Sequence, residues 1–357
     1  MHLEKEITMK KIATTLLFLA VAAACLGQDR NIRRWSEGIK DWSGYQVVDP
    51  GHEGTSYTDF SLYKEKKSTI KNGITYRYID VIAGFRPAES WVRSDKMTEQ
   101  ELSAVRRDFD LLEYFAWQFR DTLLTTQDKD GSMLIEYNRR FRKAREEVLA
   151  GADMAAYSLP AKPFDITEIP WTFSSKSGGI SLAVCTTIPF GSLARLLSPG
   201  PGLSVGFERI WEKNSFLLEG TMGTHWFKQP YYDLKGAWNN KTTTPSLSLS
   251  LSYGRDIFSG KDMHLTVQGG PTFGGYLFTS GYSVTAFTGG PGLSEGICLD
   301  YIISRAMNFT GRYPDYADSM IRVRLYVNQF YNLRGGNILP TLNISVGFHI
   351  DNRLLTR

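Results

Sequence analysis

The stretch Ser246–Tyr253 reads Ser-Leu-Ser-Leu-Ser-Leu-Ser-Tyr, so large apolar residues alternate with small hydroxyl residues. Successive side chains of a β-strand point to opposite faces. The stretch therefore predicts a strand with one apolar face and one small polar face. A helix would distribute the same leucines around its axis. The rest of the chain is best understood by asking how often this alternation returns.

The alternation returns in about seven further segments of the C-terminal half. In one of them, Leu342 and Ile344 alternate with Asn343. A soluble β-sandwich also alternates, but these runs are long enough for tilted membrane-crossing strands. Aromatic residues also gather near the strand ends, as in an interfacial girdle. We therefore expect an all-β antiparallel membrane barrel of about eight strands. A soluble secreted binding protein with a β-sandwich stays open as an alternative.

The N-terminus carries an export signal. Lys10 and Lys11 precede an apolar run, residues 12–26, which is followed by a small residue. A basic segment, a short apolar core and a small exit residue describe a secretory signal peptide, which we assign to residues 1–27. Cys25 would instead be a lipid acceptor if the signal belonged to a lipoprotein. Export and a barrel together indicate the outer membrane of a Gram-negative bacterium.

Composition excludes several other classes of protein. The chain has 357 residues, which leaves room for about two domains. Its formal net charge of +4 is too small for a nucleic-acid footprint, so no nucleic-acid partner is expected. The body of the chain contains no apolar run of about 20 residues, so no membrane-spanning helix is predicted there. We also find no phosphate-binding loop and no Cys/His metal cluster, and we expect no cofactor.

The expected domain organisation follows from these patterns. Residues 28–151 are predicted to form an α+β domain, and the proline-bearing residues 152–176 to form a linker. The barrel is expected over residues 177–350, with a tail at 351–357. Long extracellular loops and short periplasmic turns are typical of such barrels, and this rule assigns the first domain to the periplasm.

Three elements are predicted within the first domain. A hairpin turns at Asn72-Gly73, since this dipeptide favours a turn of the primed type. A helix begins after Thr98, and Glu101 stands three residues later, as in a capping box. A second, basic helix is expected at about 133–150. One face of the first helix is lined by apolar residues at alternating spacings of three and four, namely Leu102, Val105, Phe109, Leu112, Ala116, Phe119 and Leu123.

Short segments of this domain resemble a known family. They are Trp42-Ser43-Gly44, Ile74-Thr75-Tyr76, Ser90-Trp91-Val92 and Phe109-Asp110-Leu111, with Glu113 and Ala116 beyond. Together they resemble a secreted zinc-peptidase-like family of Gram-negative bacteria, in which a long helix carries His-Glu-x-x-His. Two histidines one turn apart would hold zinc there, with the glutamate as base. The matching positions here are Ala104, Val105 and Asp108. The resemblance therefore implies a degenerate, non-catalytic copy without a metal site.

Charged residues on the inner faces of the predicted strands form the main candidate site. Charges withdrawn from water must pair, so we expect a structural salt-bridge network in the lumen. A small closed barrel is filled by its own side chains, so no through-pore is expected. The predicted network consists of Glu208, Glu219, Asp300, Arg322 and Arg324.

Two functional hypotheses follow from this sequence. The first is a non-enzymatic outer-membrane protein with a structural or interaction role. It would contact outer-membrane lipid, and a protein partner at the extracellular loops or the periplasmic domain. The connection Phe227–Thr244, rich in Tyr and Trp, is the expected contact surface. The alternative is a lipid hydrolase with a His/Ser site at the barrel rim, because His225, His264 and His349 fall on the inner face.

Overall fold

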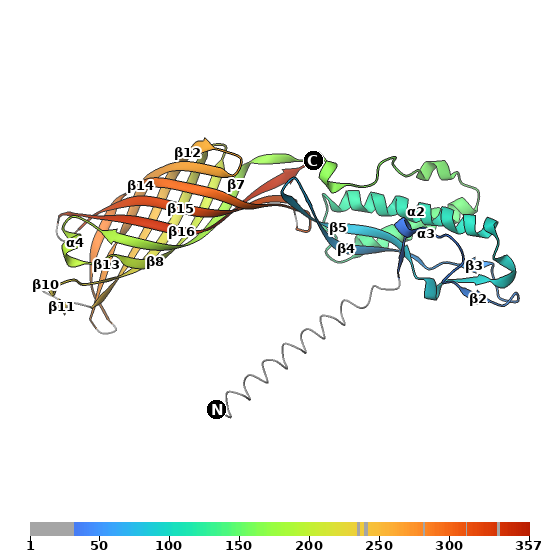
Figure 1. Cartoon of the computed structure of the whole chain (residues 1–357), viewed down its shortest axis with the longest axis horizontal. Helices are drawn as coiled ribbons and strands as arrows, with labels where there is room; N and C mark the ends of the chain where they lie inside the picture. Colours follow the sequence, from blue (N-terminus) through green and yellow to red (C-terminus); the bar gives the residue numbers. More distant parts are fainter. Residues whose placement is uncertain (1–31, 234–235, 239–241, 281–282, 312, 334–335) are drawn as a thin grey trace, which may run out of the picture. The chain divides into compact units, whose positions relative to one another are not determined.

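The computed structural model describes residues 32–233, 236–238, 242–280, 283–311, 313–333 and 336–357 (Figure 1). The chain divides into two compact units. The first holds residues up to 67 together with 79–165, and the second holds 68–78 together with 166–357. The predicted signal peptide with Cys25, and part of the Phe227–Thr244 connection, lie outside the described residues.

The first unit combines short strands, one hairpin and two helices. Its helices are α2 and α3, and its longest strands, β4 and β5, are antiparallel neighbours joined by the hairpin turn. Asn72 and Gly73 at that turn have φ of 55° and 77°, as a primed turn requires. The elements are β1 Arg33–Arg34, β2 Gln46–Val48, β3 Ser56–Tyr57, β4 Phe60–Lys71, β5 Ile74–Phe85, β6 Trp91–Arg93, α2 Glu99–Leu123 and α3 Ser132–Leu149.

Helix α2 begins as the sequence predicts, with one difference. The Thr98 hydroxyl accepts a hydrogen bond from the backbone N–H of Glu101 at 3.2 Å. The Glu101 carboxylate completes no capping box, because it accepts hydrogen bonds from the hydroxyls of Thr55 (2.8 Å) and Ser56 (2.7 Å). All seven residues of the predicted apolar face are buried. The helix is therefore tied at its first turn to the segment that carries β3.

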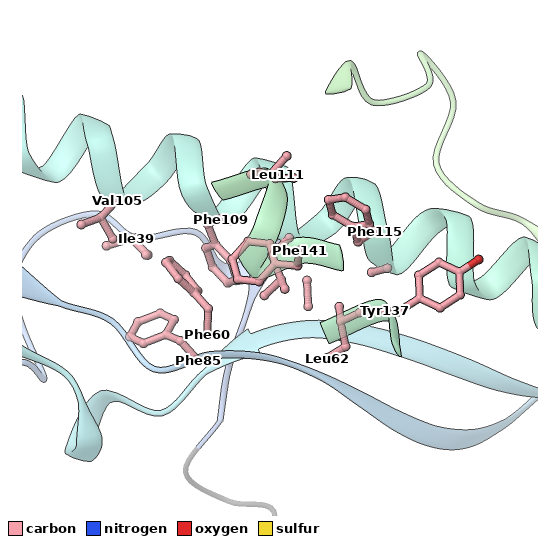
Figure 2. Packing of buried hydrophobic residues seen from close by; sticks show 14 of the residues in the cluster. Ile39, Phe60, Leu62, Phe85, Val105, Phe109, Leu111, Phe115, Tyr137 and Phe141 are labelled. Carbon is pink, nitrogen blue, oxygen red and sulfur yellow. The ribbon is translucent and has the colours of Figure 1, made fainter. Parts of the chain in front are cut away.

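The core of the first unit is aromatic (Figure 2). The ring of Phe60 on β4 lies 5.4 Å from that of Phe109 on α2 and 6.0 Å from that of Phe141 on α3. Phe85 on β5 meets Phe109 edge-on at 5.6 Å. Such edge-to-face and tilted contacts are the preferred geometry of buried rings. The hairpin and the two helices thus share one apolar core.

The second unit is dominated by a closed ring of eight antiparallel strands. Each strand pairs with the next along the chain, and the ring closes where β16 pairs with β7. The connection between β9 and β12 also carries a small separate hairpin, β10 Tyr231–Asp233 with β11 Gly236–Trp238. The ring strands are β7 Thr172–Pro189, β8 Gly200–Trp211, β9 Asn214–Trp226, β12 Thr243–Ser259, β13 Met263–Ser280, β14 Ser283–Asn308, β15 Asp315–Tyr331 and β16 Ile338–Thr356.

The two faces of these strands are inverted relative to a soluble protein. On β12, Leu249 and Leu251 are 55% and 49% exposed, whereas Ser250 is 6% exposed. The same holds on β7 and β15, where buried and exposed residues alternate almost without interruption. The predicted two-faced strand is therefore confirmed for Ser246–Tyr253. A β-sandwich would need two packed sheets, whereas these strands close into one ring.

Some strands are longer than the alternation predicted. Strand β14 runs without interruption from Ser283 to Asn308, and β15 begins at Asp315. A register shift between Ile302 and Ser304 interrupts the regular alternation there, and this bulge hid the continuation of the strand. Strand β16 likewise runs to Thr356, through most of the expected tail.

The tip of the β4–β5 hairpin, residues 68–78, belongs to the second unit. Its residues Ile74–Arg77 pair in parallel with Arg305–Asn308, the end of β14 that extends past β13. The backbone N–H of Phe309 also donates to the carbonyl of Arg77 at 2.8 Å. The hairpin tip thus covers a strand edge that the neighbouring barrel strand leaves open.

Candidate functional site: the lumen of the barrel

Two ion-pair groups lie in the lumen. We call the one that is centred on Arg322 of β15 the lower group. Its Nε and Nη2 donate to the two carboxylate oxygens of Asp300 on β14 at 2.7 and 2.8 Å. Its Nη1 lies 2.7 Å from a carboxylate oxygen of Glu208 on β8. All three side chains are at most 8% exposed. One guanidinium therefore joins three strands of the ring through a two-pronged hydrogen bond and a second ion pair.

The second ion-pair group, which we call the upper group, is centred on Arg324, two residues further along β15. Its guanidinium donates to the Glu219 carboxylate of β9. With the amide of Gln268 turned so that its oxygen faces the guanidinium, that oxygen accepts from Arg324 at 2.9 and 3.3 Å. The ring of Tyr326 lies 4.8 Å from the guanidinium carbon, within cation–π distance. The five residues of the predicted network thus fall into two separate groups.

His349 is a neighbour of the lower group that the sequence did not assign to the network. Its Nε2 lies 3.6 Å from a carboxylate oxygen of Glu208, and its ring is 1% exposed. Space for the ring comes from Gly179 on β7, where a Cβ would stand 2.3 Å from the imidazole Cε1. The missing information was the cross-strand pairing of His349 with Ser181, two residues from Gly179 on the same face of β7.

The three predicted interior histidines do not converge on one site. His225 is fully buried, and its Nε2 lies 3.1 Å from Ser246 Oγ while its Nδ1 lies 2.9 Å from the Ser198 carbonyl oxygen. His349 lies beside the lower ion-pair group, and His264 is only partly buried on β13. Of the three, His225 alone has a serine within hydrogen-bond distance among the contacts of the described residues.

An apolar cluster occupies the lumen at the end that carries the β7–β8 connection. That connection holds the short helix α4, Leu193–Leu196, and an isolated bridge pairs Leu197 with Phe227. We call this cluster the apolar cap. It consists of Leu193, Leu197, Phe227, Tyr276, Phe330 and Leu339. Along β15 and β16 the order from this end is apolar cap, polar side chains and then ion pairs.

The three positions that the family resemblance aligned with a zinc motif lie in the first unit. Ala104, Val105 and Asp108 lie on α2, and the Asp108 carboxylate accepts a 2.6 Å hydrogen bond from Arg145 of α3. Five residues further along α2, burial raises the pKa of Glu113, even though Arg120 donates to its carboxylate at 2.6 Å. Within the described ranges, no three His, Cys, Asp or Glu side chains are grouped so that they could hold a metal ion.

The fold and the lumen define a class of structure: a closed, eight-stranded antiparallel barrel with an apolar exterior and an ion-paired interior. Within the described residues, no helix has the length and apolar character needed to cross a membrane. A scan against protein-family models and a search of curated proteins found no match to this sequence.

Solved structures similar to this chain include several barrels. Neisserial surface protein A shares 10% identity at a TM-score of 0.32, covering 50% of this chain and 97% of that one. The N-terminal β-barrel domain of Pseudomonas aeruginosa OprF shares 13% identity at 0.25, covering 50% and 99%. The outer membrane protein AlkL, solved in lipid bilayers, shares 12% identity at 0.22, covering 56% and 96%. Each of these TM-scores lies below 0.5.

Proposed function

We propose that this chain is a non-enzymatic outer-membrane barrel protein with a structural or interaction role. The observation that carries this proposal is the inverted burial of the eight strands. Large apolar side chains such as Leu182 and Phe348 are 59% and 64% exposed around the outside. Soluble monomers rarely expose continuous apolar surface of this extent, because water penalises it. Lipid as the surrounding medium removes that penalty.

The experiment is fractionation of cells that express the full chain, followed by gel migration with and without boiling. A lipid-embedded barrel is expected in the outer-membrane fraction and should migrate differently when unboiled. Recovery of folded protein from the soluble fraction without detergent would contradict the proposal. Because barrels keep their fold in mild detergent, the unboiled sample also reports whether the ring is closed.

For the first unit we propose a periplasmic location and a partner-binding rather than catalytic role. Support comes from the residues at the positions that match the zinc motif, which are Ala104, Val105 and Asp108. The Asp108 carboxylate accepts a hydrogen bond from Arg145. Metal analysis of the purified full chain after exposure to zinc tests this reading. Stoichiometric zinc that survives gel filtration would overturn it, whereas a metal-free protein with no peptidase activity agrees with it. Protease accessibility in intact and in outer-membrane-permeabilised cells tests the location.

A second candidate, hydrolysis by a serine nucleophile, is favoured by one contact. A carbonyl oxygen only accepts, so the 2.9 Å contact makes His225 Nδ1 the donor to Ser198 and leaves Nε2 to accept from Ser246. An oriented imidazole that accepts from a serine hydroxyl is the arrangement of an activated nucleophile. Complete burial of His225 opposes this candidate, because a lipid acyl group needs access.

Labelling with a small fluorophosphonate distinguishes the two candidates. A nucleophilic Ser246 would be labelled in the native protein, and Ser246→Ala would abolish the label. The matched control is Ser250→Ala, since Ser250 lies on the same face of β12 and its hydroxyl also faces the lumen. We expect no labelling of the native chain, as a non-enzymatic barrel requires. Stoichiometric label on Ser246 would replace the first candidate by the second.

A further inference from the structure

A small cavity with polar and apolar lining borders the apolar cap. It has a volume of about 20 Å³ for the centre of a water molecule, which is enough for one or two waters. Phe330 and Tyr276 of the apolar cap also line it, so the cap and the cavity share a boundary. Its polar lining includes Thr187, Thr221, Ser246, Tyr276, Asn328 and Asn343.

Several lining groups already have partners within the protein. Thr187 Oγ1 donates to Asn343 Oδ1 at 2.6 Å, and the Thr221 hydroxyl lies 3.4 Å from the Tyr326 hydroxyl. Ser246 is bonded to His225, as described above. The bonds of Thr187 and Ser246 join neighbouring strands, whereas the Thr221–Tyr326 contact runs across the lumen from β9 to β15. They leave the remaining polar atoms to be satisfied from within the cavity.

Two lining atoms have no hydrogen-bond partner among the described residues: Tyr276 Oη and Asn328 Oδ1. Their residues are 1% and 3% exposed. A buried polar atom left unpaired is costly, so native proteins pair nearly all of them with protein groups or ordered water. The two atoms also complement each other, because the Tyr276 hydroxyl can donate or accept and the Asn328 oxygen accepts.

We propose that this cavity is a binding site for ordered water, which bridges Tyr276 Oη and Asn328 Oδ1 beneath the apolar cap. The lining contains hydroxyls, amides and apolar groups but no ionised side chain. A neutral ligand is therefore required, because a desolvated ion without an opposite charge is strongly disfavoured. The volume limits that ligand to the size of water. The proposal concerns the lumen and stands apart from the role of the protein in its membrane.

The sign of one stability change tests the proposal. If water bridges the two atoms, Tyr276→Phe removes a hydrogen bond and leaves the water less well held. The equilibrium constant for unfolding of the full chain in detergent should then rise by roughly three- to tenfold. If Tyr276 Oη is truly unpaired, the same change removes a buried polar group and should lower that constant. Tyr331→Phe is the matched control, because Tyr331 points outward and is 49% exposed.

A crystal structure of the unaltered chain tests the proposal without any substitution. In a high-resolution crystal structure of the unaltered chain, the proposal predicts water density within about 2.7–3.2 Å of both Tyr276 Oη and Asn328 Oδ1. A cavity without density, or one in which the two side chains turn to bond other protein groups, overturns it. Loss of that density in crystals of Tyr276→Phe, with the rest of the lumen unchanged, would assign the hydroxyl as one of its ligands.

Discussion

The same residue type occupies opposite environments in the two units of this chain. Leu112 on α2 is fully buried among aromatic rings, whereas Leu249 on β12 is 55% exposed. Ser250, next to Leu249, is buried in its place. Apolar side chains face away from water. Whether a leucine is buried in protein therefore depends on the medium around its unit and not only on its residue type. The first unit therefore buries its leucines in a protein core, whereas the barrel places them on its outer face.

Ion pairs differ between the units in the same way. In the first unit, Arg106 and Glu99 pair at 2.6 Å with both side chains well exposed. In the barrel, Arg322 pairs with Glu208 and Asp300 almost completely out of water. Exposed pairs contribute at most about 1 kcal/mol, whereas removing one partner of a buried pair leaves an uncompensated charge. The loss of unfolding free energy on removing one charge should therefore differ between the two units more than the loss caused by any other substitution.

The largest expected effect is that of Arg322→Ala. It leaves the Glu208 and Asp300 carboxylates buried without their shared cation, and the barrel should lose about 3–5 kcal/mol of unfolding free energy. Denaturant unfolding of the full chain in detergent measures the loss. Arg255→Ala, at an exposed position near the end of β12, is the control and should change stability by less than about 0.5 kcal/mol. Equal effects of both variants would mean that the lumen is hydrated and the pairs are screened.

The next effect in size compares one substitution in both environments. Leu112→Ala opens a cavity in the core of the first unit and should cost about 3 kcal/mol. Leu249→Ala shortens a side chain on the outer face, where lipid or detergent can fill the space, so it should cost less than half as much. Hydrogen exchange of α2 and of β12 in the full chain reports the two losses separately. A larger loss at Leu249 than at Leu112 would mean that the outer face is packed against protein.

Much of the barrel was predictable because a strand repeats every two residues. The alternation identified the strands and assigned Leu249 outward and Ser250 inward, as the structure has them. The ends of the strands were not predictable where a bulge interrupts the alternation, as between Ile302 and Ser304. The pattern specifies a face, but it carries no information on where pairing with a neighbour stops.

The alternation assigned charged residues to the inner face, but it did not say which of them pair. Arg322 and Arg324 were placed inside by the same alternation that orients the leucines. Which carboxylate each one meets depends on the stagger between strands, and distant pairs such as Arg324 with Glu219 follow from closing the ring. The contact of His225 with Ser246 was missed for the same reason, although β9 and β12 are adjacent.

The smallest expected effect concerns a buried carboxylate that the first unit holds without an arginine. Asp128 accepts hydrogen bonds from the backbone N–H groups of Met133 (3.0 Å) and Leu134 (3.3 Å) in the first turn of α3. It also accepts from Lys64 of β4 at 2.7 Å. Burial opposes the charge, but the Lys64 hydrogen bond and the helix amides outweigh it and lower the pKa of Asp128. Asp128→Asn keeps the shape and should cost about 1–2 kcal/mol near pH 7.

The lowered pKa fixes the pH at which this difference disappears. An acid with a lower pKa in the folded state stabilises that state fully above its unfolded pKa of about 3.9. The contribution begins to fall below about pH 4 and is lost as the pH passes through the folded pKa, so the difference between the unaltered chain and Asp128→Asn should shrink over this acidic range. Hydrogen exchange of the α3 amides, corrected for intrinsic rates, measures the stability difference between the two chains near pH 7 and in the acidic range. A difference that persists unchanged at pH 3 would mean that the Asp128 charge does not stabilise α3, and that the first unit holds this side chain by shape alone.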